Sequence, residues 1–368
     1  MAWQGIEGHD DVVARFVAAA SRGRIAGAFL FIGPDGVGKG LFARTLAKAL
    51  VCPAPRPGLE PCGNCPSCIQ ASAGSHPDID VVEKPEDRAT IPLEVFIGDR
   101  EHRMREGLCW RILLAPALGR RKVAIILDAD HLSDEAANCL LKTLEEPPDS
   151  SAIILVGTAL ERQLPTIRSR CQIIRFAPLE SGTVATILRR DIASGAIEAA
   201  GIDDATIDSC AARSGGSLSR ARLLLDPHLA GFRARLLDML SHRPLHGVDL
   251  AREVQQLVEA AGKDAPPRRA RLRVVLGAAL DFFRASLRSS AGSADAGRDG
   301  ERQPTADPEL QHAVASWGGS AEQATVGIRC TLDALDGIER NAHLPTLVDA
   351  WTVHLEPAAP PAPPGKGR

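Results

Sequence analysis

The chain has 368 residues, of which 45% are hydrophobic and 24% are charged, and its formal net charge is −3. This length predicts two or three domains, and the composition supplies enough apolar side chains for a core in each of them. A protein that binds nucleic acid by itself is usually basic, so this charge limits any nucleic-acid contact to a local surface or to partner subunits. No hydrophobic run reaches the length of a membrane span, so we expect no membrane association of that kind.

The first residues, MAWQGIEGHDD, have neither the basic segment nor the apolar core of a signal peptide, and we expect a cytoplasmic protein. The chain contains nine cysteines. Because cytosolic thiols are kept reduced, these cysteines are predicted to be free thiols or metal ligands rather than disulfides.

The first half of the chain alternates helical patterns with short apolar runs. Residues 10–25 have the spacing of an amphipathic helix, and AFLFI (28–32) is a candidate buried strand that leads into a glycine-rich loop. Strands this apolar, separated by helices, indicate a parallel sheet covered on both faces. The pattern continues with helical spacing at 41–51 and apolar runs at 122–127, 152–157 and 171–176. We therefore predict an α/β domain over residues 1–177.

After Pro178 the sequence predicts helices only. Residues 178–228 have the pattern of short helices, and residues 229–356 that of longer ones. The stretch 289–307 is small, polar and unpatterned, which is typical of a mobile loop. Residues 357–368 are rich in Pro and Ala, which is typical of a disordered tail.

The glycine-rich loop GPDGVGKG (33–40) matches the phosphate-binding pattern G-x-x-x-x-G-K-[ST] at all positions but the last, Gly40. In such a loop the backbone N–H groups and the N-terminus of the next helix surround phosphates, and the lysine adds a positive charge. The alternative is a glycine-rich turn with a solvated lysine. In this loop the predicted nucleotide-binding residues are Gly33, Gly36, Gly38 and Lys39, and the same degenerate site is predicted to include Asp128 and Thr158.

The side chains that would hold magnesium are altered. Gly40 lacks the hydroxyl that Ser or Thr offers to Mg²⁺. In the run IILDADHL, Leu127 stands where the metal-holding Asp is expected, and Asp128 stands where the water-activating acid is expected. A shift by one residue would let Asp128 hold the metal, but Ala129 then leaves no adjacent base. We predict that ATP can bind and that its hydrolysis is weak or absent.

Two further stretches are highly specific: NCLLKTLEEPP (138–148) and LPTIRSRCQIIRF (164–176). With the loop and a cysteine cluster, they resemble the bacterial clamp-loader ATPases of the AAA+ class over about residues 1–226. The resemblance implies an AAA+ RecA-like P-loop domain over 1–177 with a zinc module inserted at about 52–68, a small helical lid over 178–228, and an all-α collar over 229–356 that joins a ring.

Two subunit types of that family are similar to this chain. The gamma/tau motors of DNA polymerase III keep the Thr and the acidic pair that are lost here, so the chain is more similar to the delta-prime type, a stator with little or no ATPase activity. The implied partners are gamma/tau and delta subunits in a hetero-pentameric ring, and through the complex the sliding clamp and primer–template DNA. The alternative is an ATP-hydrolysing gamma/tau-type motor. A P-loop kinase would leave the second stretch and the helical C-terminus unexplained.

No polymerase chemistry is visible in the sequence, so the description DNA-directed DNA polymerase, a nucleotidyltransferase, would belong to the holoenzyme. The motif Ser169-Arg170-Cys171 matches the family's Ser-Arg-Cys, in which the arginine reaches into a neighbour's nucleotide site. A guanidinium placed on the transferring phosphoryl group in trans can accelerate hydrolysis by about 10³–10⁵. The alternative is a surface arginine in a loop. Thr158 matches the position called sensor 1, and it is equally well explained as a capping hydroxyl.

The cysteine cluster reads C-x9-C-x2-C-x2-C. Four thiolates at this short spacing can surround one tetrahedral Zn²⁺, and since no coordination position is left open the role is structural. The family carries a zinc module at the same place. The alternative is four reduced cysteines on a surface insertion. The predicted ligands are Cys52, Cys62, Cys65 and Cys68.

Overall fold

The chain folds into two compact units, Met1–Ala221 and Arg222–Arg368, each with its own core. The structure is a computed structural model, and it describes residues 3, 5–23, 25–85, 88–102, 105–197, 202–292 and 307–360.

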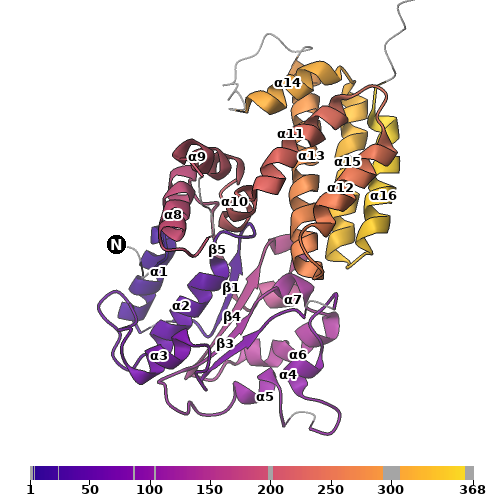
Figure 1. Ribbon diagram of the computed structural model, residues 1–368. Coiled ribbons are helices and arrows are strands. Elements are labelled where there is room, and N and C mark those ends of the chain that lie inside the picture. Colours follow the sequence, from indigo (N-terminus) through magenta and orange to yellow (C-terminus); the bar gives the residue numbers. More distant parts are fainter. Residues whose placement is uncertain are drawn as a thin grey trace, which may run out of the picture. The chain divides into compact units, whose positions relative to one another are not determined.

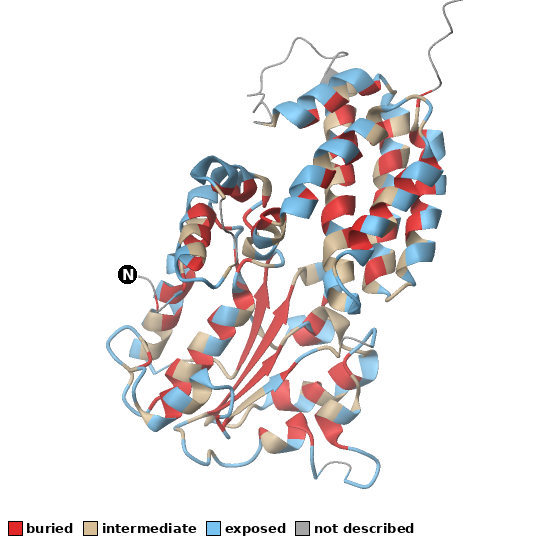
Figure 2. Cartoon of the chain, viewed as in Figure 1, coloured by how far each residue is buried: buried red, intermediate tan, exposed pale blue. Residues whose placement is uncertain are grey.

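The first unit is built on one five-stranded sheet in which all paired strands are parallel (Figure 1). Every residue of β1, β3 and β4 is buried, because helices cover both faces of the sheet (Figure 2). The parallel sheet predicted from the apolar runs is therefore confirmed. In spatial order the strands are β2 (Ile79–Val82), β3 (Lys122–Ile126), β4 (Ser151–Gly157), β1 (Ala28–Ile32) and β5 (Gln172–Arg175).

Alternate residues of each strand supply two separate cores. Phe29 and Phe31 of β1 pack with aromatic side chains of α1 and α2 on one face, whereas Leu30 packs with α4 to α7 on the other. The helices of the first unit are α1 (Asp10–Ser21), α2 (Lys39–Val51), α3 (Pro66–Ser72), α4 (Glu94–Ile97), α5 (Leu108–Arg111), α6 (Asp134–Glu145), α7 (Pro165–Arg168), α8 (Ser181–Ala193) and α9 (Asp204–Arg213), with 3₁₀ turns η1 (Ala129–His131) and η2 (Leu160–Arg162). The division between the two units falls within α10 (Leu218–Leu224).

In its described residues the second unit consists of helices joined by short turns, with no strand, as the sequence predicts. The long α13 packs against α11, α14 and α15. None of the helices in the described ranges combines the length and the apolar character needed to cross a membrane. The elements of this unit are α11 (Pro227–Ser241), α12 (Gly247–Glu259), α13 (Ala265–Gly292), α14 (Pro308–Trp317), α15 (Ala321–Glu339), α16 (Leu344–Leu355) and η3 (Glu356–Ala358).

Two predicted irregular segments are described only at their ends. Residues 289–292 of the predicted mobile loop belong to α13, and 293–306 lie outside the described residues. At the start of the predicted tail, Ala358 is buried in η3, and 361–368 lie outside the described residues.

A buried carboxylate fixes the loop that precedes β3. Asp78 is fully buried, and its Oδ1 accepts a hydrogen bond from the N–H of Ala117 at 2.6 Å. Its Oδ2 accepts from the N–H groups of Leu118 and Gly119 at 2.8 and 2.6 Å. Burial alone would raise the pKa of Asp78, but these three donors and the nearby Lys122 ammonium outweigh burial and hold the pKa below its usual value.

We expect Asp78→Asn to lower the free energy of unfolding of the first unit at pH 7 by about 2 to 3 kcal/mol, because the new amide N–H₂ would face backbone N–H donors. The lowered pKa means that the ionised group stabilises the fold above its unfolded pKa of about 3.9, and that this stabilisation is lost as pH falls through the folded pKa. Urea midpoints at pH 7 and through pH 5 to 3 measure both effects. The exposed Asp11→Asn is the control, and an unchanged midpoint for Asp78→Asn at pH 7 would contradict the assignment.

Candidate nucleotide and metal sites

The glycine-rich loop joins the end of β1 to the start of α2, as the sequence predicts. In the sheet β1 lies between β4 and β5, with the other two strands beyond β4. Open parallel sheets bind ligands at their carboxyl edge where the strand order reverses, and the loop lies at this edge. Gly38 precedes the first helical residue with a φ of 96°, a conformation that a glycine adopts without strain.

The predicted phosphate-binding lysine is turned onto its own loop. Lys39 is buried, and its Nζ donates to the carbonyl oxygens of Gly33 at 2.7 Å and of Pro34 at 2.5 Å. Burial lowers the pKa of Lys39, and the charges of Asp35 and Asp130 act in the opposite direction. Its ammonium is therefore partnered by carbonyl oxygens of its own loop.

Other parts of the first unit hold the same loop from two sides. The N–H of Leu218 donates to the Gly36 carbonyl at 2.9 Å, and the His9 ring bonds the Val37 carbonyl through Nε2 at 2.8 Å. Gly36 has a φ of 74°, and a Cβ there would lie only 2.2 Å from Ser217 Oγ. The segment before α10 thus packs tightly on the centre of the loop.

The two positions that would hold magnesium face each other without oxygen ligands. A Cβ on Gly40 would lie 3.6 Å from Leu127 Cδ2. Asp128 is exposed in a left-handed conformation, with a φ of 56°, and its carboxylate accepts from the Lys84 N–H at 3.3 Å. Because Mg²⁺ requires a near-octahedral set of oxygen ligands, a glycine opposite a leucine methyl group weakens such a site.

Asp130, which no sequence motif singled out, bonds the residue that follows β4. Its Oδ2 accepts from the Thr158 N–H at 2.8 Å and from the Thr158 hydroxyl at 2.7 Å. Its Oδ1 accepts from Gln163 Nε2 at 2.5 Å, and its charge acts on Lys39. The Thr158 hydroxyl is thus engaged inside the chain. In the sequence, Asp130 is marked only as a second acid two residues after Asp128.

Arg170 belongs to a separate cluster. It lies after α7 with its side chain 29% exposed, and its Nε donates to Glu145 Oε1 at 2.7 Å. Nη2 donates to the same oxygen, and Nη1 donates to the carbonyl of Thr166 at 3.0 Å and to Ser169 Oγ at 3.2 Å. None of these partners belongs to the group around Lys39, so the structure does not bring Arg170 into the cluster of its own phosphate loop.

The four predicted metal ligands converge. Their sulfur atoms all lie within 4.8 Å of one another, with Cys52 and Cys65 4.0 Å apart and Cys62 and Cys68 3.8 Å apart. Zn–S bonds of about 2.3 Å in a tetrahedron place the sulfurs about 3.8 Å apart, so the cluster fits zinc. Backbone N–H groups of Asn64 and Cys65 lower the pKa of Cys62 to about 6. The cluster joins the end of α2 to the start of α3.

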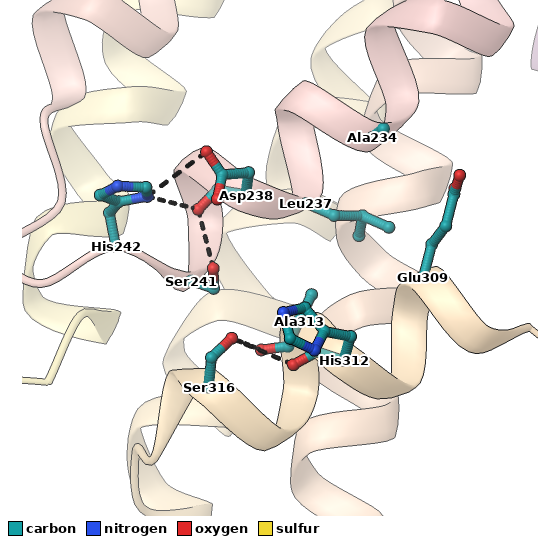
Figure 3. Close-up of a pocket in the computed structure, with 9 residues that line it drawn as sticks. All are labelled: Ala234, Leu237, Asp238, Ser241, His242, Glu309, His312, Ala313 and Ser316. Atoms are coloured by element: carbon teal, nitrogen blue, oxygen red, sulfur yellow. Dashed lines mark hydrogen bonds and ion pairs between the residues drawn. The ribbon is translucent and has the colours of Figure 1, made fainter.

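The second unit contains a hollow of about 410 Å³ between α11 and α14 (Figure 3). His242 bonds the Asp238 carbonyl through Nδ1 at 2.8 Å, and Ser316 Oγ donates to the His312 carbonyl at 3.0 Å. The Glu309 carboxylate of α14 accepts from Arg233 of α11 at 2.8 Å. These side chains do not form a set of donors converging on an anion.

Known proteins match part of this chain. A family model described as "DNA polymerase III, delta subunit" matches residues 8–180. The gamma/tau subunit of Mycobacterium tuberculosis is 35% identical over 227 residues, which are 61% of this chain and 37% of that protein. The delta′ subunit of Pseudomonas aeruginosa is 37% identical over 150 residues (41% and 43%), and that of Escherichia coli is 33% identical over 178 residues (48% and 50%). The chain thus spans half or less of the length of these relatives.

We expect the native protein to contain one zinc ion and Cys65→Ser to lose it, with a lower thermal midpoint for the first unit. The physical reason is that the metal crosslinks α2 to α3, so its binding free energy contributes to folding. Zinc content by elemental analysis and thermal unfolding measure the two effects. Cys330→Ser, in the second unit, should keep both values. Native protein with no zinc and four freely titratable thiols in the cluster would contradict the metal site.

Proposed function

From the premise that this chain belongs to the clamp-loader family of DNA polymerase III subunits, we propose that it is a delta-prime-type stator. In this proposal it assembles with gamma/tau motors and a delta subunit in a hetero-pentameric ring that loads the sliding clamp onto primed DNA in replication. Its own contribution to ATP hydrolysis is Arg170, offered in trans to the nucleotide of a neighbouring motor.

The observation that carries this proposal is the pair Gly40 and Leu127. In a P-loop ATPase, a hydroxyl at the first position and a carboxylate at the end of the facing strand hold Mg²⁺ against the β- and γ-phosphates. Here a glycine faces a leucine methyl group, and Asp128 bonds the backbone of Lys84. The fold of an ATPase is kept while the side chains for magnesium-dependent hydrolysis are not.

Arg170 retains what a trans-acting arginine requires. Its guanidinium is partly exposed and is fixed by Glu145 and Thr166 rather than by the chain's own phosphate loop. A planar guanidinium can donate two parallel hydrogen bonds to a phosphoryl group and neutralise the charge that develops on it. A subunit that does not hydrolyse ATP can in this way be catalytic for its neighbour.

The zinc ion has a structural role in this proposal. Cys52, Cys62, Cys65 and Cys68 would supply all four ligands, which leaves no position for water or substrate. When bound, the ion would crosslink the segment between α2 and α3 and take part in no reaction.

A gamma/tau-type motor is the second candidate, favoured by the 35% identity over 227 residues to the mycobacterial gamma/tau subunit. A motor must hold magnesium at its own site, and Gly40 and Leu127 weigh against this. The contacts of Leu218 and His9 with the phosphate loop also suit a site that remains closed.

We expect Arg170→Ala to slow ATP hydrolysis at the neighbouring site by about 10³ or more, because the charge on the transferring phosphoryl group is no longer neutralised. The measurement is ATP turnover by a complex reconstituted from gamma/tau, delta and this chain, with clamp and primed DNA present. The ATP turnover that remains in the Arg170→Ala complex should not exceed the turnover of the nucleotide sites to which this chain contributes no arginine.

Arg170→Lys is the matched variant. It keeps the positive charge but loses the planar pair of donors, so we expect it to fall between wild type and Arg170→Ala. If the complex with Arg170→Ala assembles normally and turns over ATP and loads clamps at the wild-type rate, the proposed role of this subunit is wrong.

A further inference from the structure

The last residue of α6 and the arginine that follows α7 form an ion pair across 25 residues of sequence. Glu145 and Arg170 keep 48% and 29% of their side chains exposed. An exposed pair of this kind contributes little to folding stability, because solvent screens it and two long side chains lose freedom to form it. Stability therefore does not account for the pairing, and its geometry indicates another role.

Glu145 contacts one edge of the guanidinium. Nε and Nη2 both donate to Glu145 Oε1, while Nη1 donates to the Thr166 carbonyl and to Ser169 Oγ. A guanidinium is planar and has five N–H donors, so these four hydrogen bonds fix its plane and leave one N–H, on Nη2, without a partner among them. An oxyanion can accept from this N–H without displacing Glu145.

The helix that carries Glu145 is a rigid base. The hydroxyl of Ser133 caps the start of α6 by accepting from the Ala136 N–H at 3.2 Å, and Leu140 and Leu144 are buried in the core beneath the sheet. Just after the helix, the ring of Pro147 packs closely on Gly27, and a Cβ added to Gly27 would lie 2.3 Å from Pro147 Cγ. Glu145 is therefore held between a packed helical turn and a packed proline.

We propose that Glu145 is the positioning residue for Arg170, holding its guanidinium by the Nε–Nη2 edge in the orientation that receives the phosphoryl group of a neighbouring subunit's nucleotide. This inference rests on the proposed function and adds to it the acid that orients the arginine. A long, flexible arginine loses conformational freedom when it binds a transition state, and a partner that orients it beforehand removes part of that cost. Glu145 itself does not touch the nucleotide.

The opposite role is a latch, in which Glu145 competes with the phosphoryl group and keeps the arginine inactive. The two roles predict opposite signs for the same variant. Removing a positioning residue slows hydrolysis, whereas removing a latch accelerates it. Attachment of the acid to the sheet-packed α6 favours positioning, because a latch must release the arginine at each turnover.

The test is ATP turnover by the reconstituted complex with Glu145→Ala, Glu145→Gln, Arg170→Ala and the double variant Glu145→Ala/Arg170→Ala in this chain. We expect Glu145→Ala to lower kcat at the neighbouring site by about 10- to 100-fold with the KM for ATP unchanged, since displacing a reacting group by about 1 Å can cost 10². Glu145→Gln should retain most of the activity, because its amide oxygen can still accept from Nε and Nη2. Glu146→Ala, at the next exposed position, is the matched control and should leave kcat unchanged.

The double variant separates positioning from a structural role. If Glu145 acts through Arg170, Glu145→Ala changes nothing further once Arg170 is absent, and thermal midpoints of the single variants stay at the wild-type value. Three results would overturn the inference: a full effect of Glu145→Ala in the Arg170→Ala background, a wild-type kcat for Glu145→Ala, or an increased kcat for Glu145→Ala. In each of these cases, a slow complex with Arg170→Ala would still support the proposed function. A wild-type rate for Arg170→Ala would overturn both.

Discussion

A parallel sheet buried on both faces sets the position of the residues of the first unit that the sequence assigns to a nucleotide site. Because β1, β3 and β4 run in the same direction, their carboxyl ends lie along one edge. The positions just beyond these ends are those that a nucleotide site of this kind would use. Here they are occupied by Gly33, Leu127 and Thr158. The strands between them are entirely buried, so their register cannot shift without exposing the core.

At this edge the backbone follows the phosphate-loop pattern, but the side chains that would hold magnesium differ from it. The loop retains its glycines, its lysine and its place before a helix, yet the lysine bonds the loop's own carbonyls and a leucine occupies the position of a metal ligand. The arginine cluster lies on other elements, and its partners Glu145 and Thr166 are independent of the loop. In the proposed function, this independence would let the chain lack magnesium chemistry and still offer Arg170 to a neighbouring subunit.

Much of this architecture follows from the sequence. The strands β1, β3 and β4 are predictable because four or more apolar residues occur together in each. The strand β5 is predictable from the shorter apolar pair Ile173 and Ile174 in the run CQIIRF. The convergence of the four cysteines is predictable because thiols at such short spacing are typical of a tetrahedral metal site. The strand β2 was not predicted. Its sequence IDVV is short, it lies at the edge of the sheet, and Val81 is exposed, so it lacks the fully buried pattern of the central strands.

Side-chain partners were the main limit of the prediction. The family motif points to Leu127 and Asp128, but it is Asp130 that accepts hydrogen bonds from Thr158 and Gln163. The reason is that Asp128 has a left-handed conformation and turns the chain at the start of η1. The partner of Arg170 is likewise distant in sequence, and only the packing of α6 beside α7 brings Glu145 to it. Local patterns predict which elements form, but they do not contain the contacts between elements.

The central claim is that this chain lacks productive magnesium chemistry of its own and acts on a neighbour's ATP. The most direct measurement is ATP turnover by the purified chain with magnesium, compared with turnover after gamma/tau is added. The account predicts no turnover above the buffer rate for the chain alone and stimulated turnover in the assembled complex. Brisk, magnesium-dependent hydrolysis by the chain alone would contradict it.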